Sequence, residues 1–103
     1  MIQAVTEAVT DAALDAVRDN PEAGRFELTA AGETAFARYR REPGTLVVTY
    51  VYAPPALRGT GIAGALMEGV AARARAEGAR ILPLCGYARG WLRASRAHRD
   101  LIA

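Results

Sequence analysis

The chain has 103 residues, 51% of them hydrophobic, which suits one compact domain with a single core. Thirteen basic residues against 11 acidic ones give a formal net charge of +2, and because every basic residue is an arginine, a P-loop with its Gly-Lys-Ser/Thr is excluded. The single cysteine excludes an internal disulfide, and no apolar run approaches the ~20 residues of a membrane-spanning helix.

The N-terminal sequence, the distribution of charge and the absence of metal-ligand spacing limit the expected location and binding partners. The first twenty residues carry acidic side chains and no apolar core segment, so we expect no secretory signal and a cytoplasmic location. The arginines are scattered along the chain and alternate with Glu and Asp, which disfavours a nucleic-acid partner. No cluster of His, Cys, Asp or Glu has the spacing of a metal site, so no metal is expected.

The first predicted element is a helix over residues 2–17, where apolar residues recur three to four positions apart. Residues 20–24, Asn-Pro-Glu-Ala-Gly, are typical of a turn. Strands are predicted at 25–29 and 34–40, with turns around them that favour an antiparallel meander.

The strongest predicted strand covers residues 45–52. Its β-branched and aromatic residues are apolar on both faces, which predicts a central, buried strand that ends at Ala53-Pro54-Pro55.

A helix is predicted from Ile62 onward, with Leu66, Val70 and Ala74 on its apolar face and Gly78 at its C-terminus. Residues 79–84 follow as a buried strand, so strand, helix and strand form a parallel pair with a right-handed crossover. The tail, residues 88–102, is predicted to form one or two short helices that bring Trp91, Leu92, Leu101 and Ile102 to the core. The predicted fold class is α+β: an antiparallel meander followed by a βαβ unit, with helices packed on the sheet.

The loop between this strand and helix, Gly59-Thr60-Gly61-Ile62-Ala63-Gly64, matches the glycine pattern of dinucleotide-binding loops. Two features oppose a Rossmann site. Residues 54–58 separate the strand from the first glycine, and residues 79–84 lack the acid that would bind the ribose. Taken alone, the loop fits a phosphate-binding turn and a plain glycine-rich turn equally well.

Read as Arg58-Gly59-Thr60-Gly61-Ile62-Ala63, the loop resembles the Arg/Gln-x-x-Gly-x-Gly/Ala acetyl-CoA signature of the GNAT N-acetyltransferase superfamily. Residues 83–87, Pro-Leu-Cys-Gly-Tyr, are similar to the Pro-x-Cys-x-aromatic stretch of a short single-domain branch. The similarity covers roughly residues 17–103. It implies a single GNAT-like domain over residues 1–103 with a mixed sheet, to which residues 1–16 are a helical addition.

The resemblance implies acetyl-CoA as co-substrate and an amine as acceptor. The unpaired amides and positive dipole end of the predicted helix suit a diphosphate on independent physical grounds. The pantetheine arm would lie between two diverging strands. The implied coenzyme-binding residues are Val51, Tyr52, Ala53, Arg58, Gly59, Thr60, Gly61, Ile62, Ala63 and Gly64.

The predicted catalytic residues are Cys85 and Tyr50; Tyr52 and Tyr87 are further candidates for the proton donor. In the resembling branch a thiol at the Cys85 position is the suggested active residue, either as a transient acetyl carrier or as an acid for the CoA thiolate. A lone cysteine at a strand end also fits buried packing. The branch usually has His-Thr where Tyr50-Val51 stand here, and a phenol is a poor base at neutral pH but a usable acid.

The sequence therefore predicts an acetyl-CoA-dependent N-acetyltransferase with an unidentified amine acceptor. The alternative is a non-catalytic module that binds CoA or acyl-CoA, which the missing histidine favours. An arginine-rich nucleic-acid partner is a further alternative.

Overall fold

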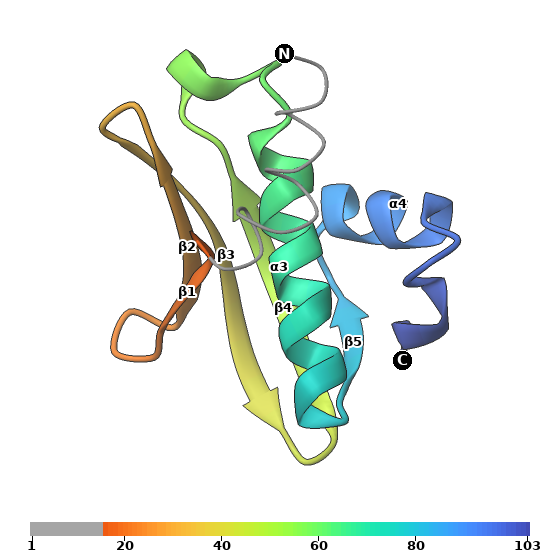
Figure 1. Ribbon diagram of the computed structural model, residues 1–103. Coiled ribbons are helices and arrows are strands. Elements are labelled where there is room, and N and C mark those ends of the chain that lie inside the picture. Colours follow the sequence, from red (N-terminus) through yellow and green to blue (C-terminus); the bar gives the residue numbers. More distant parts are fainter. Residues whose placement is uncertain (1–15) are drawn as a thin grey trace.

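The computed structural model describes residues 16–103, which form a five-stranded sheet with two helices packed on it (Figure 1). The helix predicted over residues 2–17 lies outside the described residues except at its last two positions. Within the described residues, no helix combines the length and apolarity needed to cross a membrane. The strands, in their order across the sheet, are β1 (Arg18–Asn20), β2 (Arg25–Ala30), β3 (Glu33–Glu42), β4 (Thr45–Tyr52) and β5 (Arg80–Pro83).

The strand pairing confirms the predicted α+β fold. Strands β1 to β4 pair antiparallel in sequence order, and β4 pairs with β5 in parallel. The crossover between them is α3 (Ile62–Glu77), which lies along the sheet in Figure 1. After β5 come α4 (Gly86–Ala94) and a 3₁₀ turn, η3 (Arg99–Leu101), as predicted for the tail.

Strand β1 was not predicted, since Asn20 was assigned to a turn. Its sequence, Arg-Asp-Asn, has low strand propensity, so local pattern does not reveal it. Tertiary contacts hold it: Asn20 pairs with Arg25 of β2, and Asp19 forms an ion pair with Arg41 of β3 at 3.1 Å.

Helix α3 buries the face that its spacing predicts: Ile62, Leu66, Val70 and Ala74 are all buried. It ends at Gly78, whose φ of +69° is a left-handed conformation that favours glycine, and the Gly78 N–H reaches the carbonyls of Ala74 and Arg75. The same core cluster includes Leu92 of α4 and the buried faces of β2 to β5, so both helices cover one face of the sheet.

A β-bulge in β4 decides which side chains reach the core. Arg38 pairs with Tyr50 and Tyr39 with Val48, so Thr49 is an extra residue. The alternation therefore shifts: Val48 and Val51 both pack against the core cluster, and Tyr50 and Tyr52 lie on the opposite face.

Strand β4 is central, as predicted, but only its first half is fully buried. Leu46, Val47 and Val48 have no exposed surface, whereas Tyr50 is 48% exposed. The reason is that β5 pairs only with Thr45–Val48. The Leu84 N–H bonds to the Val48 carbonyl at 2.9 Å, and the chain then turns into α4. Beyond Val48, the β5-facing edge of β4 pairs with no strand among residues 16–103.

Candidate functional site

The candidate site lies where the chain passes from β4 into α3. A short 3₁₀ turn, η2 (Pro55–Leu57), makes the connection, and Leu57 is buried beneath it. The Thr60 N–H and hydroxyl both donate to the Leu57 carbonyl. Gly59 and Gly61 have φ of +81° and +87°, so the loop reaches the helix through two left-handed positions that favour glycine.

The N-terminus of α3 is uncapped, and we call this end of the helix, with its first backbone N–H groups, the helix mouth. The Ala65 N–H makes the first helical hydrogen bond, to the Gly61 carbonyl at 3.0 Å. Within residues 16–103, the N–H groups of Ile62, Ala63 and Gly64 meet no acceptor, and no side chain caps the helix. The first turn also carries no acidic residue. The positive end of the helix dipole is therefore not neutralised by the described part of the chain.

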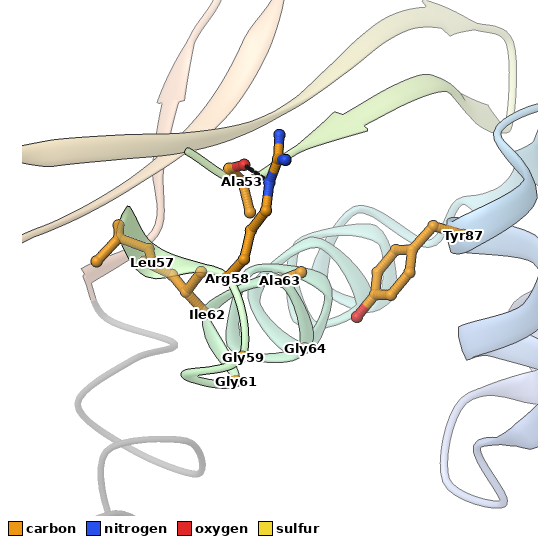
Figure 2. Close-up of a pocket in the computed structure, with 9 residues that line it drawn as sticks. All are labelled: Ala53, Leu57, Arg58, Gly59, Gly61, Ile62, Ala63, Gly64 and Tyr87. Carbon is orange, nitrogen blue, oxygen red and sulfur yellow. Dashed lines mark hydrogen bonds between the residues drawn. The ribbon is translucent and has the colours of Figure 1, made fainter. Parts of the chain in front are cut away.

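A pocket of about 260 Å³ opens at this helix mouth (Figure 2). It is formed by the residue that follows β4, by η2 and the glycine loop after it, by the first turn of α3 and by the start of α4. Its walls are Ala53, Leu57, Arg58, Gly59, Gly61, Ile62, Ala63, Gly64 and Tyr87.

The structure brings most of the predicted coenzyme-binding residues to this pocket. Of the predicted loop residues 58–64, only Thr60 lies outside the lining, because its side chain turns back to the Leu57 carbonyl. Ala53 lines the pocket, and Val51 and Tyr52 precede it on β4 without lining it.

Arg58 connects the pocket with the sheet. Its Nε donates to the Ala53 carbonyl at 2.8 Å, and its guanidinium carbon lies 5.7 Å from the centre of the Tyr52 ring. Figure 2 shows the side chain directed away from Gly59 and Gly61, toward the end of β4. The positive charge predicted at the loop thus sits at the strand end.

Tyr87 is the proton-donor candidate that lines the pocket. It comes from the first turn of α4, and Figure 2 shows its ring extending toward the first turn of α3. Partial burial raises the pKa of the Tyr87 phenol above its ordinary value of 10.0, and the neighbouring Cys85 raises it further. The phenol is therefore protonated at neutral pH and can donate a proton. Only the tertiary structure separates Tyr87 from the other tyrosines.

The two predicted catalytic residues lie outside the pocket lining. Cys85 precedes α4, is partly buried and packs against the core cluster. Tyr50 lies on the face of the sheet opposite the core, with its ring centre 6.4 Å from that of Tyr52. The structure thus separates both residues from the lining, and their catalytic roles stay predictions.

The single histidine forms a hydrogen bond with a residue that does not line the pocket. His98 Nε2 lies 2.9 Å from a Glu68 carboxylate oxygen, and its ring stacks on Trp91. Among residues 16–103, no group of three or more His, Cys, Asp or Glu side chains is arranged to hold a metal ion.

Comparison with models of protein families identifies a family for this chain. A family model described as GCN5-related N-acetyl-transferase matches residues 25–101, which run from the start of β2 to the end of η3 and include every residue of the pocket lining. A search of curated proteins found no match.

Proposed function

The chain belongs to the GCN5-related N-acetyltransferase family, and on that premise we propose that it transfers an acetyl group from acetyl-CoA to an amine. The observation that carries the proposal is the uncapped mouth of α3, where three unpaired amides open onto a pocket.

The diphosphate of the coenzyme is proposed to bind the backbone at Gly61–Gly64. Anionic oxygens suit this place because free N–H groups and the positive dipole end converge there. A side chain at Gly59 or Gly61 would meet open space, so the backbone of the loop is accessible to a ligand. The Arg58 guanidinium adds a positive charge where the pocket meets the end of β4.

The pantetheine arm is proposed to lie along the edge of β4 that β5 leaves free, beside Val51, Tyr52 and Ala53. An unpaired strand edge offers N–H and C=O groups to an amide-bearing ligand. The backbone N–H groups near Tyr52 and Ala53 are proposed to polarise the thioester carbonyl.

The reaction forms a C–N bond and breaks the C–S bond of the thioester. The neutral amine attacks the acetyl carbon, sulfur leaves with the bonding electron pair, and the nitrogen loses a proton to solvent. We propose that the Tyr87 hydroxyl gives its proton to the leaving sulfur, since Tyr87 lines the pocket and its phenol is protonated at neutral pH. Cys85 is the second candidate donor, or a transient carrier of the acetyl group, and Tyr50 is the third.

Isothermal titration with acetyl-CoA tests the proposal. We expect saturable binding that desulfo-CoA reproduces and adenosine alone does not, because the diphosphate and the arm make most of the contacts. The absence of heat at millimolar acetyl-CoA would refute the assignment.

A non-catalytic CoA-binding module is the second candidate, because Tyr50-Val51 replace the His-Thr pair of the resembling branch. The two candidates differ in turnover. A catalyst releases free CoA thiol in proportion to the added amine, whereas a binding module releases none. Mass spectrometry after incubation with acetyl-CoA alone shows in addition whether Cys85 carries an acetyl group.

A further inference from the structure

The face of the sheet opposite the core carries a cluster of aromatic and arginine side chains. Cross-strand partners place Glu27, Phe36 and Tyr52 in one row of this face and Arg25, Arg38 and Tyr50 in the next. We name the cluster of Phe36, Tyr50, Tyr52, Arg25, Arg38 and Arg58 the aromatic–arginine face. Within residues 16–103, both α3 and α4 pack on the other side of the sheet.

The three rings form a continuous apolar surface. The ring centres of Phe36 and Tyr52 are 5.2 Å apart in a stacked arrangement, and Tyr50 lies 6.2 Å from Phe36 and 6.4 Å from Tyr52. These separations are those of interacting aromatic pairs. The β-bulge at Thr49 is what turns both tyrosines to this side.

Guanidinium groups surround the rings. The guanidinium carbons of Arg25 and Arg38 lie 4.4 Å and 5.4 Å from the centre of Phe36, and that of Arg58 lies 5.7 Å from Tyr52. Stacking on rings holds a guanidinium in place and leaves its edge N–H groups free to donate. Three guanidinium groups, one of them paired with Glu27, thus surround one apolar patch.

The negative charge within these two rows is already neutralised. Glu27 is 7% exposed and accepts hydrogen bonds from Arg25 at 2.6 Å, from Asn20 at 3.1 Å and from Arg18 at 3.4 Å. In the described part of the chain, Arg38 has no carboxylate partner, and Arg58 has a single hydrogen-bond acceptor, the neutral Ala53 carbonyl. The cluster therefore has a net positive charge and suits an anionic group.

The aromatic–arginine face is continuous with the pocket. Tyr52 is followed by Ala53, which lines the pocket, and Arg58 belongs to both the pocket wall and the cluster. A molecule on this face would therefore sit beside the end of β4, where the proposed function puts the thioester.

We propose that the aromatic–arginine face binds the amine acceptor, and that this acceptor carries a carboxylate or a phosphate near its amine. The inference rests on the proposed function and narrows its substrate class. Guanidinium groups bind both anions through paired, charge-assisted hydrogen bonds, whereas the same positive field opposes an acceptor that carries only amines. Polyamines are thus disfavoured.

Matched acceptors test the inference. Lysine differs from 1,5-diaminopentane by one carboxylate, and O-phosphoethanolamine differs from ethanolamine by one phosphate. We expect kcat/KM to be about tenfold higher for the anionic member of at least one pair, the effect of one charge-assisted hydrogen bond. Arg38→Gln should reduce that preference by a similar factor and leave the Kd of acetyl-CoA unchanged.

Arg40→Gln is the matched control, because Arg40 lies two residues further along β3 on the same face and pairs with Glu42 at 3.0 Å. It should retain the preference. A binding readout without turnover comes from the ring NMR signals of Phe36, Tyr50 and Tyr52, which should shift with lysine and not with 1,5-diaminopentane.

The outcomes separate the two proposals. Acetyl-CoA binding with equal or better turnover of the members that lack an anionic group overturns the anionic acceptor and leaves the acetyltransferase intact. Absence of acetyl-CoA binding refutes the acetyltransferase itself. If the ring signals shift only with an oligodeoxythymidylate, the face binds nucleic acid and the acceptor proposal is wrong. If they shift only as the protein concentration rises, the face contacts a second copy of the chain and the acceptor proposal is also wrong.

Discussion

Gly61 and Gly44 both adopt a left-handed backbone conformation, one beside the pocket and one in a turn far along the chain from it. Both have positive φ, +87° and +70°, and a side chain at either position would meet open space. A β-branched residue cannot adopt this conformation without strain, so its cost is conformational rather than steric. Gly61 shapes the helix mouth, and Gly44 only turns β3 into β4. Substituting each glycine in turn therefore distinguishes the effect of backbone strain alone from the loss of a binding site.

We predict that Gly61→Val weakens acetyl-CoA binding at least about tenfold, because the loop must leave its left-handed conformation and turn its amides away. Both Gly61→Val and Gly44→Val should lower the free energy of unfolding by ~1–2 kcal/mol, but Gly44→Val should leave the Kd of acetyl-CoA unchanged. Titration calorimetry and urea denaturation measure the two quantities. Equal Kd values for both variants would show that the loop does not hold the coenzyme.

Tyr87 and Cys85 lie two residues apart and differ in what they face. Tyr87 lines the pocket, and Cys85 packs against the core cluster. We predict that Tyr87→Phe lowers kcat at least about tenfold with little change in the Kd of acetyl-CoA, because a general acid contributes only to the chemical step. Cys85→Ala should retain most of kcat.

The pH profile adds an independent check on Tyr87. The acid must be protonated, and its pKa is raised above 10.0, so activity that depends on it is lost only as pH rises through that higher value. The alkaline decline should disappear in the Tyr87→Phe variant. If Cys85→Ala abolishes turnover and Tyr87→Phe does not, the thiol is the catalytic group.

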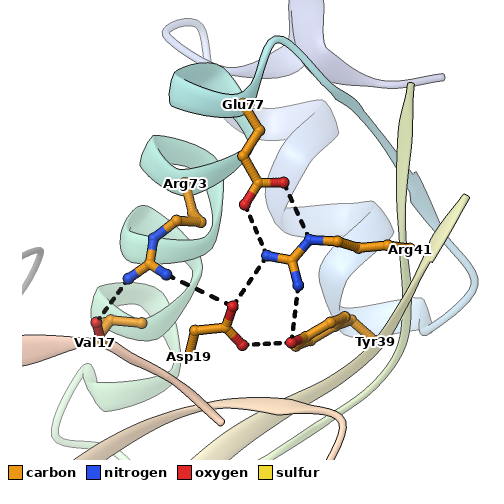
Figure 3. A network of polar contacts seen from close by, with 6 residues as sticks. All are labelled: Val17, Asp19, Tyr39, Arg41, Arg73 and Glu77. Atoms are coloured by element: carbon orange, nitrogen blue, oxygen red, sulfur yellow. Dashed lines mark hydrogen bonds and ion pairs between the residues drawn. The ribbon is translucent and has the colours of Figure 1, made fainter. Parts of the chain in front are cut away.

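At the scale of elements, a polar network fastens β1 and β3 to α3 (Figure 3). Arg41 of β3 donates to Glu77 of α3 at 2.7 Å and to Asp19 of β1 at 3.1 Å. Tyr39 donates to the other oxygen of Asp19, and Arg73 reaches the Val17 carbonyl at 3.3 Å. The network compensates for the low strand propensity of β1.

We predict that Arg41→Gln lowers the free energy of unfolding by about 1 kcal/mol, since the pairs are partly exposed and screened by solvent. The adjacent Arg40→Gln breaks a single, more exposed pair with Glu42 and should change stability by only a few tenths. Urea denaturation of both variants measures the difference. Equal effects would mean that the network contributes no more than one surface pair.

At the scale of the whole molecule, the sheet separates two environments. Helices α3 and α4 and the core occupy one face, and the aromatic–arginine face lies on the other. Strand β4 belongs to both, and its end borders the pocket. The proposed coenzyme site and the proposed acceptor site therefore meet at one strand end, which is what transfer between two substrates requires.

Global stability is predicted to depend on pH through Glu27. Its pKa is lowered below 4.5, chiefly by the hydrogen bond from Arg25, against the opposing effect of burial. A carboxylate whose pKa is lowered by folding stabilises the fold at pH values above its ordinary, unfolded-state pKa. That contribution is lost as the pH falls through the lowered pKa. Urea denaturation between about pH 5 and 3 should show this loss.

Glu27→Gln should flatten the acid-induced loss, and Glu42→Gln, in an exposed pair, should not. If the wild type and Glu27→Gln lose stability in parallel on acidification, another group accounts for the dependence.

The sequence alone determined the strands and α-helices from β2 onward, the parallel crossover and the glycine loop, because periodicity and turn residues are local signals. It also identified the loop residues that now line the pocket. It did not reveal β1, whose stability comes from partners distant in sequence. It could not distinguish Tyr87 from Cys85, because which side chain faces a pocket depends on how α4 packs.

The tertiary structure alone decided which arginines gather. Arg25, Arg38 and Arg58 are separated along the chain and alternate with other residues, so they read as scattered. Strand pairing brings alternate residues of neighbouring strands into rows, and the bulge at Thr49 adds Tyr50 and Tyr52 to the same face. A bulge depends on register between strands, which no local pattern specifies, and so the charge and chemistry of this face appear only in the folded molecule.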